Sequence, residues 1–116
     1  MNETIAETGN EITIKINDVA WSVKRVDPNH AGLYVNGVAC VGTTWPAKAE
    51  IYIADNQAPS KMLLTIRHEL AHAFLNCTQI RAPESFSEEE ICEFVALHGG
   101  QVMRLAEVIV EAIGNR

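Results

Sequence analysis

Residues 61–77 read KMLLTIRHELAHAFLNC, and the middle of this stretch, HELAH at residues 68–72, is an HExxH motif. Apolar residues recur here at three- and four-residue steps, which predicts a helix with one buried face. At roughly 100° per residue, that face lies nearly opposite His68 and His72. The sequence therefore predicts a helix that packs on a core with one side and carries two histidines on the other.

The HExxH pattern combines two metal ligands and a base on one turn of a helix. Residues four apart share a face, so the imidazoles of His68 and His72 can bind one zinc ion. Glu69 then lies beside a water on that ion, which is the arrangement of a zinc hydrolase. Two surface histidines on an amphipathic helix are the alternative. Leu64 and Leu75 lie on the histidine side and indicate a covered face, whose polar groups need a partner such as a metal.

Composition and charge limit the class of protein. The 116 residues suffice for one modest core, so residues 1–116 are expected to form a single domain. A hydrophobic share of 47% and a charged share of 21% are typical of a globular protein. The net charge of −6, from 15 acidic and 9 basic residues, argues against nonspecific binding to nucleic acid or to an anionic membrane.

The N-terminus and the cysteines favour a cytoplasmic protein. The first residues contain no basic segment followed by an apolar run, and no stretch approaches the length of a membrane helix. The cysteines, Cys40, Cys77 and Cys92, have no paired spacing, which predicts reduced thiols rather than a disulfide framework. Cysteine ligands for zinc are disfavoured because the chain contains no CxxC pair.

Four segments before the motif have the patterns of β-strands. Some alternate apolar and polar residues, and others are short runs rich in β-forming residues. In the third segment the Asn36-Gly37 dipeptide is flanked by apolar pairs, which predicts a hairpin turn. Residues 1–10 are polar and are expected to be disordered. The four segments are residues 11–16, 19–26, 32–41 and 50–54.

A second, longer helix is predicted after the motif helix. Ser87 and Glu90 form a capping box, and a long apolar stripe follows them. Gly99-Gly100 lie within this helix, where they allow a kink or a close backbone approach. The order of elements predicts an α+β fold, a small antiparallel or mixed sheet of three to four strands followed by two helices. The stripe consists of Ile91, Val95, His98, Val102, Leu105 and Ile109.

A hydrolytic zinc site keeps three protein ligands, so a third donor must come from outside the motif. The second helix offers Glu89, Glu90, Glu93 and His98. His98 lies within the apolar stripe, as a core histidine would, and Glu90 is placed to cap its own helix. Glu89 and Glu93 lie one turn apart, which suits a ligand followed by a carboxylate that orients a histidine. That pair is nearly opposite the stripe, as a solvated acidic face would also be, so both interpretations remain open.

Residues 50–96 resemble the ImmA/IrrE type of zinc metallopeptidase and the small HExxH proteins of phages and mobile elements. These proteins share a strand ending in a short turn, an HExxH helix, and a helix that opens with Glu-x-x-(Ala/Cys)-(Asn/Asp)-x-x-Ala. Here that pattern reads EEICEFVA at residues 89–96. Glu93 stands where Asn or Asp is usual, and Ala71 replaces the usual glycine before the second histidine.

The resemblance implies a site and an activity. It makes His68, His72 and Glu89 the ligands of one zinc ion per chain and Glu69 the general base, as in gluzincins with a zincin-like fold. The implied reaction is hydrolysis of a peptide bond in a protein or peptide substrate, such as a repressor or other regulatory protein. A non-catalytic binding module with a structural metal, acting like an antirepressor, is the alternative. The intact Glu69 favours the enzyme, because a purely structural site needs no base.

The strand before the motif helix has an expected role in substrate binding. In related zincins this strand is an edge that pairs with an extended substrate, and residues 50–54 occupy the matching place. Tyr52 could reach the cleft from it and help to align or activate a substrate. A tyrosine that alternates with Ile51 and Ile53 is also typical of the outer face of a strand.

Overall fold

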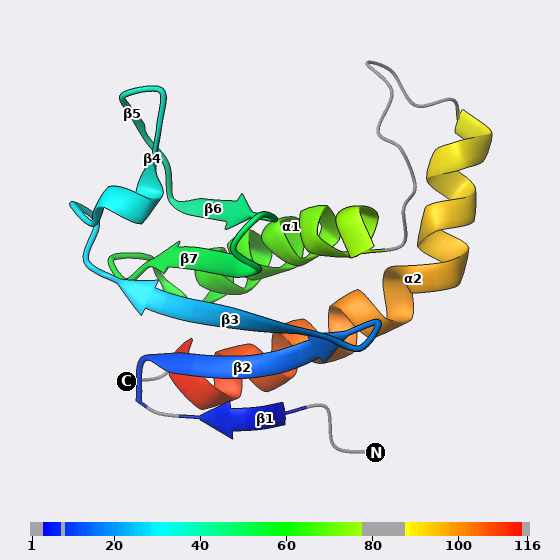
Figure 1. Ribbon diagram of the computed structural model, residues 1–116, viewed down its shortest axis with the longest axis horizontal. Helices are drawn as coiled ribbons and strands as arrows, with labels where there is room; N and C mark the ends of the chain where they lie inside the picture. Colours follow the sequence, from blue (N-terminus) through cyan, green and yellow to red (C-terminus); the bar gives the residue numbers. More distant parts are fainter. Residues whose placement is uncertain (1–3, 8, 78–87, 115–116) are drawn as a thin grey trace.

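The described residues fold into a mixed sheet with helices packed on one face (Figure 1), so the predicted α+β class is confirmed. This computed structural model describes residues 4–7, 9–77 and 88–114. No helix in these ranges is long and apolar enough to cross a membrane. The elements are β1 (Thr4–Glu7), β2 (Glu11–Ile16), β3 (Val19–Val26), the 3₁₀ turn η1 (Ala31–Leu33), β4 (Tyr34–Val35), β5 (Val38–Ala39), β6 (Gly42–Trp45), β7 (Glu50–Ala54), α1 (Pro59–Cys77), α2 (Glu88–Ile109) and the π-helical turn η2 (Val110–Gly114).

The sheet places β6, not β7, at the edge beside the motif helix. Among the described residues its strand order is β1-β2-β3-β7-β6, with β3 and β7 parallel and the other pairs antiparallel. The expectation that residues 50–54 form an edge strand is therefore wrong. Residues 50–54 do form a strand, as predicted. The strand β6, which was not predicted, pairs with the edge of β7, with partners from Gly42–Ile53 to Trp45–Glu50.

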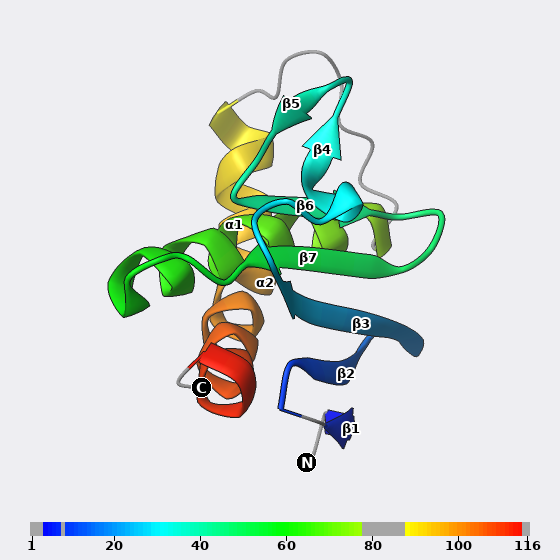
Figure 2. The same cartoon turned by 90° about the vertical axis from the view of Figure 1, so that its left-hand side faces the viewer.

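The hairpin predicted at Asn36-Gly37 is confirmed as β4 and β5, which form a separate two-stranded ribbon. Asn36 and Gly37 have φ angles of 53° and 80°, so both central residues of the turn adopt the left-handed conformation of a type I′ hairpin. The ribbon stands away from the main sheet next to β6 (Figure 2). The β4–β5 ribbon therefore lies beside β6, the edge strand of the main sheet.

The core lies between the sheet and the two helices. The buried face of α1 carries Met62, Ile66 and Leu70, each with at most 1% of its surface exposed. These side chains share one apolar cluster with Ile51 and Ile53 of β7. The predicted helix and its buried stripe are therefore confirmed, and the stripe fixes how α1 is rotated about its axis.

The far end of α1 is held by the β2–β3 turn and by β3. Asn17 Nδ2 donates to the carbonyl oxygen of Cys77 at 3.1 Å, and Trp21 Nε1 donates to Cys77 Sγ at 3.2 Å. One bond satisfies a carbonyl in the last turn of the helix, which has no partner within the helix. The helix that carries the motif is thus anchored along its core face and at its C-terminal end.

The second helix is buried over only part of its length. Val102, Leu105 and Ile109 lie in the core, whereas Ile91 and Val95 are 52% and 60% exposed. The predicted apolar stripe is therefore confirmed for the second half of α2 and wrong as a buried stripe for the first. The first half extends past the sheet (Figure 1), which leaves its apolar side chains without a β-surface to cover. α2 is one helix from Glu88 to Ile109, and Figure 1 shows that its axis bends near the middle of this range, which contains Gly99-Gly100. The capping residue Ser87 lies outside the described residues.

The N-terminal segment contains one strand more than expected. Thr4–Glu7 form β1, which pairs antiparallel with β2, so the expectation of disorder over residues 1–10 is wrong for this part. Residues 1–3 and 8 lie outside the described residues. Main-chain pairing to the free edge of β2 needs no apolar pattern, which is why the polar sequence gave no signal. The described sheet has five strands instead of three to four.

Candidate functional site

The two motif histidines lie side by side on the exposed face of α1. The centroids of the His68 and His72 rings are 4.9 Å apart, and the ring planes meet at 74°. Both side chains are exposed, because the buried stripe of α1 faces the opposite direction. This arrangement suits two imidazoles that share one metal ion from consecutive turns of a helix.

Glu69, between the histidines, is buried with only 7% of its surface exposed. The Thr44 hydroxyl of β6 lies 2.6 Å from Glu69 Oε1 and donates to it. The same hydroxyl lies 3.1 Å from the main-chain carbonyl oxygen of Glu69. A carboxylate removed from water requires such donors, so the edge strand supplies what the burial of Glu69 demands.

Gly42 lets β6 approach α1 closely at Glu69. A Cβ atom at this position would lie 2.6 Å from Cγ2 of Thr65, 3.0 Å from Cγ of Glu69 and 3.2 Å from its Oε2. Distances of this size leave no room for a side chain. The glycine is therefore a condition for the contact between the edge strand and the motif.

The motif lies at the centre of a groove between β6 and α1. Two adjoining hollows of about 430 and 410 Å³ share Cys40, Gly42, His68 and Glu69. One hollow extends along α1 before the histidines, and the other extends past them toward the end of the helix. The first is completed by Val41, Lys61, Leu64 and Thr65, and the second by Val35, Thr43, Thr44, Trp45, Pro46, His72 and Asn76.

The predicted third ligands are not brought to the histidines. Glu89, Glu90 and Glu93 lie exposed in the first turns of α2. Within the described ranges, no three His, Cys, Asp or Glu side chains converge closely enough to hold a metal ion. The donors therefore fit zinc in part: two imidazoles are in place beside a buried carboxylate, and the third ligand is not assembled with them.

His98, the other candidate ligand, lies in an aromatic contact. Its ring centroid is 5.8 Å from that of Phe74 and 5.4 Å from that of Phe94. Phe74 follows His72 by two residues, which places it on the opposite side of α1. His98 thus packs where the helices cross, as a core histidine does, and not beside the motif.

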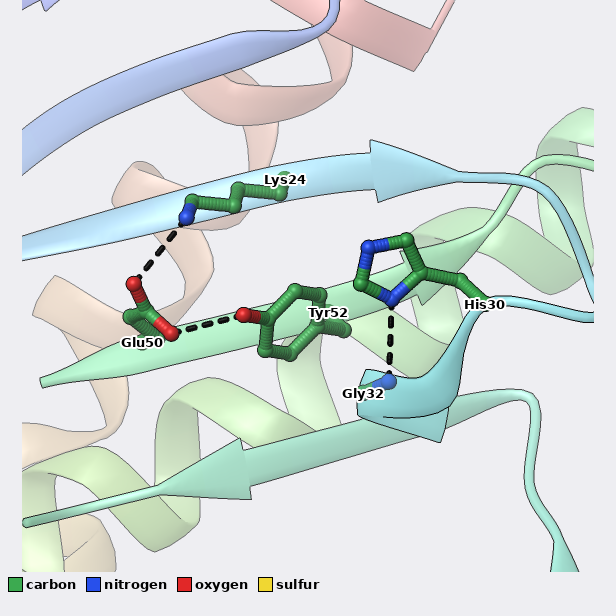
Figure 3. A network of polar contacts seen from close by, with 5 residues as sticks. All are labelled: Lys24, His30, Gly32, Glu50 and Tyr52. Atoms are coloured by element: carbon green, nitrogen blue, oxygen red, sulfur yellow. Dashed lines mark hydrogen bonds and ion pairs between the residues drawn. The ribbon is translucent and has the colours of Figure 1, made fainter. Parts of the chain in front are cut away.

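Tyr52 lies away from the groove. It packs with Leu33 and Ala54 in a small cluster on the other face of the sheet, while its neighbours along β7 join the main core. Its hydroxyl donates to Glu50 Oε1 at 2.7 Å, and Lys24 Nζ lies 3.0 Å from Glu50 Oε2 (Figure 3). The expectation that Tyr52 aligns a substrate is therefore not supported, since alternation along the strand directs it away from α1.

The contacts of Tyr52 shift the ionisation of its partners. The hydrogen bond from Tyr52, followed by that from Lys24, holds the pKa of Glu50 below its ordinary value of 4.5. The Glu50 carboxylate in turn raises the pKa values of Tyr52 and Lys24. Because the folded pKa of Glu50 is depressed, its contribution to stability is present above about pH 4.5 and is lost as the pH falls through the folded value.

Tyr52→Phe should raise the pKa of Glu50 toward 4.5, because the strongest hydrogen bond to the carboxylate is removed. A carbon-detected NMR titration of the glutamate carboxyl groups measures this change. The same variant should keep its wild-type affinity for zinc and any hydrolytic activity, since Tyr52 faces away from the histidines. A loss of activity in correctly folded Tyr52→Phe would show that Tyr52 takes part in the reaction.

The cysteines, all within the described ranges, are free thiols, as the sequence predicted. Cys77 is tied to Trp21 at the end of α1, and Cys92 is exposed on α2. Cys40 lies at the junction of both hollows. Its place in the groove carried no signal in the sequence, because it depends on β6 turning beside α1.

Comparison with known proteins gave no match. No protein-family model, no curated protein and no solved structure aligns with this chain.

Sequence reasoning missed the groove residues on β6. Thr44 and Gly42 belong to a four-residue strand whose sequence, GTTW, has no apolar alternation. Two features were available as weak signals: a glycine three residues after the hairpin, and β-branched residues between that hairpin and the next strand. Neither identifies a neighbour of Glu69 without the fold.

Proposed function

We propose that this chain is a zinc-dependent metallopeptidase with a zincin-like fold, in which His68 and His72 bind the metal and Glu69 is the general base. One observation carries the proposal: a buried glutamate held by a hydroxyl lies between two adjacent exposed histidines at the centre of a groove. Polar groups placed together in a hollow of this size mark a site of binding or catalysis.

The roles of the residues follow from their chemistry. Bound zinc supplies a Lewis acid that polarises the substrate carbonyl and favours ionisation of the attacking water. Glu69 takes a proton from that water as its oxygen adds to the carbonyl carbon, and then passes the proton to the departing amine as the C–N bond breaks. Each histidine binds zinc through a neutral imidazole nitrogen.

The groove favours an extended peptide as the substrate. In the described sheet β6 has one free edge, and such an edge can pair with an extended chain through main-chain hydrogen bonds. Val41 and Leu64, 47% and 59% exposed, provide apolar surface on either wall of the first hollow. We therefore assign substrate alignment to β6 and propose a protein or peptide substrate, such as a regulatory protein.

The third ligand is proposed to be Glu89, with Glu93 or Glu90 as the alternatives. In the described residues these carboxylates lie apart from the histidines, so coordination requires the first turns of α2 to approach α1. The apolar side chains of that part of α2 are exposed, which leaves surface that such an approach would cover. Glu93 would then orient a histidine from outside the ligand set.

The purified protein should bind about one zinc ion per chain. His68→Ala and His72→Ala should each weaken that binding strongly, because each removes a ligand, and calorimetric titration of the metal-free protein measures the change. Glu89→Ala should weaken it similarly, whereas Glu107→Ala, an exposed carboxylate on the other half of α2, serves as the control. Binding that is unaffected by either histidine variant would refute the proposal.

A non-catalytic binding module on the same scaffold is the second candidate. It is favoured by the groove and the free edge of β6 in the described sheet, which can hold an extended partner without any hydrolysis. The two functions differ in one observable, since the module binds zinc or a protein partner without cleaving any peptide. Incubation of the zinc-loaded protein with a library of unstructured peptides, read by mass spectrometry, separates them.

A further inference from the structure

Building on the proposed function, we propose that Thr44 is the positioning residue of the general base. Its hydroxyl fixes Oε1 of Glu69, which leaves Oε2, beside Gly42, as the oxygen that accepts the proton. Oε1 has a donor at 2.6 Å, whereas Oε2 lies next to the space that a side chain at position 42 would fill. The two oxygens of one carboxylate thereby have different tasks.

The edge strand is a rigid support for this contact. Thr44 pairs with Ile51 across the β6–β7 ladder, and Ile51 points into the core on the helix side of the sheet. Gly42 is two residues before Thr44, so the two positions share that face of the strand. The register that directs the hydroxyl at Glu69 therefore also places the glycine against it.

The second contact of the Thr44 hydroxyl links β6 to the main chain of α1 at the general base. The same oxygen lies 3.1 Å from the carbonyl oxygen of Glu69, so both the side chain and the main chain of Glu69 are held at a fixed position relative to β6. A substrate aligned along β6 would then meet the base at a fixed offset. Displacement of a catalytic group by about 1 Å can lower the rate about 100-fold, so holding Glu69 in place relative to β6 has a large effect on the reaction.

A purely structural role predicts something different. If Thr44 only joins the strand to the helix, its loss lowers stability and leaves the turnover of folded enzyme unchanged. If it positions the base, kcat falls while KM and zinc affinity remain close to the wild-type values. Thr13 of β2 provides the comparison, since it carries the same side chain, pairs with Ser22 of β3 and lines neither hollow of the groove.

The test uses full-length Thr44→Val, Thr44→Ser and Thr13→Val, each with and without Glu69→Gln. Thr44→Val keeps the shape of the side chain and should lower kcat by about 10- to 100-fold, within the range of a misplaced catalytic group. Thr44→Ser keeps the hydroxyl and should retain most of the activity. Thr13→Val makes the same change outside the groove and should leave kcat unchanged. Thr44→Val should have no further effect on turnover once Glu69 is Gln.

Three results would overturn the proposal: unchanged kcat in Thr44→Val, an equal loss in Thr44→Ser, or a loss that persists in the Glu69→Gln background. A readout independent of activity is the coupling between Thr44→Val and Glu69→Ala in the unfolding of metal-free protein, because alanine, unlike glutamine, cannot accept the Thr44 hydrogen bond. Zero coupling would mean that the contact is not formed, whatever the activity. Strong coupling in a protein that cleaves nothing would refute the peptidase and, with it, the positioning role, while leaving the contact established.

Discussion

Glu69→Gln should lower kcat for peptide hydrolysis by about 100- to 10,000-fold, the range that a positioned general base contributes. The amide cannot accept a proton from the attacking water, but its carbonyl oxygen can still accept the Thr44 hydrogen bond. The carboxylate is not one of the proposed ligands, so the variant should still bind about one zinc ion per chain. Cleavage of a sensitive peptide pool, measured together with the zinc content, checks both expectations.

The control for this variant is Glu107→Gln, which makes the same chemical change at an exposed position of α2. It should leave turnover and zinc content unchanged. Wild-type rates in Glu69→Gln would exclude Glu69 as the base, even if the protein proves to be a zinc enzyme. Simultaneous loss of zinc and activity would indicate instead that Glu69 holds the metal site together.

The sequence was sufficient wherever a local pattern determines the structure. The bounds of β2, β3 and β7 follow from alternation or from runs of β-forming residues, and most of the motif helix follows from helical periodicity. The Asn36-Gly37 turn follows from the φ angles that its residues tolerate. In each case the pattern spans only a few neighbouring residues. The histidine face of α1 was predictable for the same reason, because it is the complement of the buried stripe.

Pairing between distant segments is what the sequence left open. β6 joins the sheet through β7, and its polar sequence shows no preference for an edge over a loop. This affects the candidate site, because β7 was expected to be the edge strand beside the motif helix and that edge is formed by β6. The Thr44–Glu69 hydrogen bond spans 25 residues and could not be read from either segment alone.

The second helix shows a different limit. Its apolar stripe has the periodicity of a buried face, but burial depends on what the helix passes over, and only its second half crosses the sheet. The same uncertainty affects Glu89 and Glu93, whose phase on the helix allowed both a ligand and a solvated acidic face. In the described structure Glu89 and Glu93 lie on the solvated face. Zinc titration of the single variants identifies the third ligand.

Leu70→Ala should destabilise the protein by about 2–5 kcal/mol, the usual cost of a large-to-small change in a packed core. Leu70 is the central residue of the motif and is fully buried, in the same cluster as Ile51 and Ile53 of β7. Since small domains have a total stability of about 5–15 kcal/mol, this loss is a large part of the whole. Urea unfolding of the metal-free protein measures it.

Leu64→Ala is the matched control, because it makes the same change on the same helix at a side chain that is 59% exposed. Its cost should stay near about 0.5 kcal/mol, typical of surface positions. Equal losses for the two leucines would mean that α1 does not face the core as described, and the exposed histidine pair would then lose its basis. A large difference between the two losses would show that Leu70 faces the core, so that His68 and His72, on the other side of α1, face the solvent.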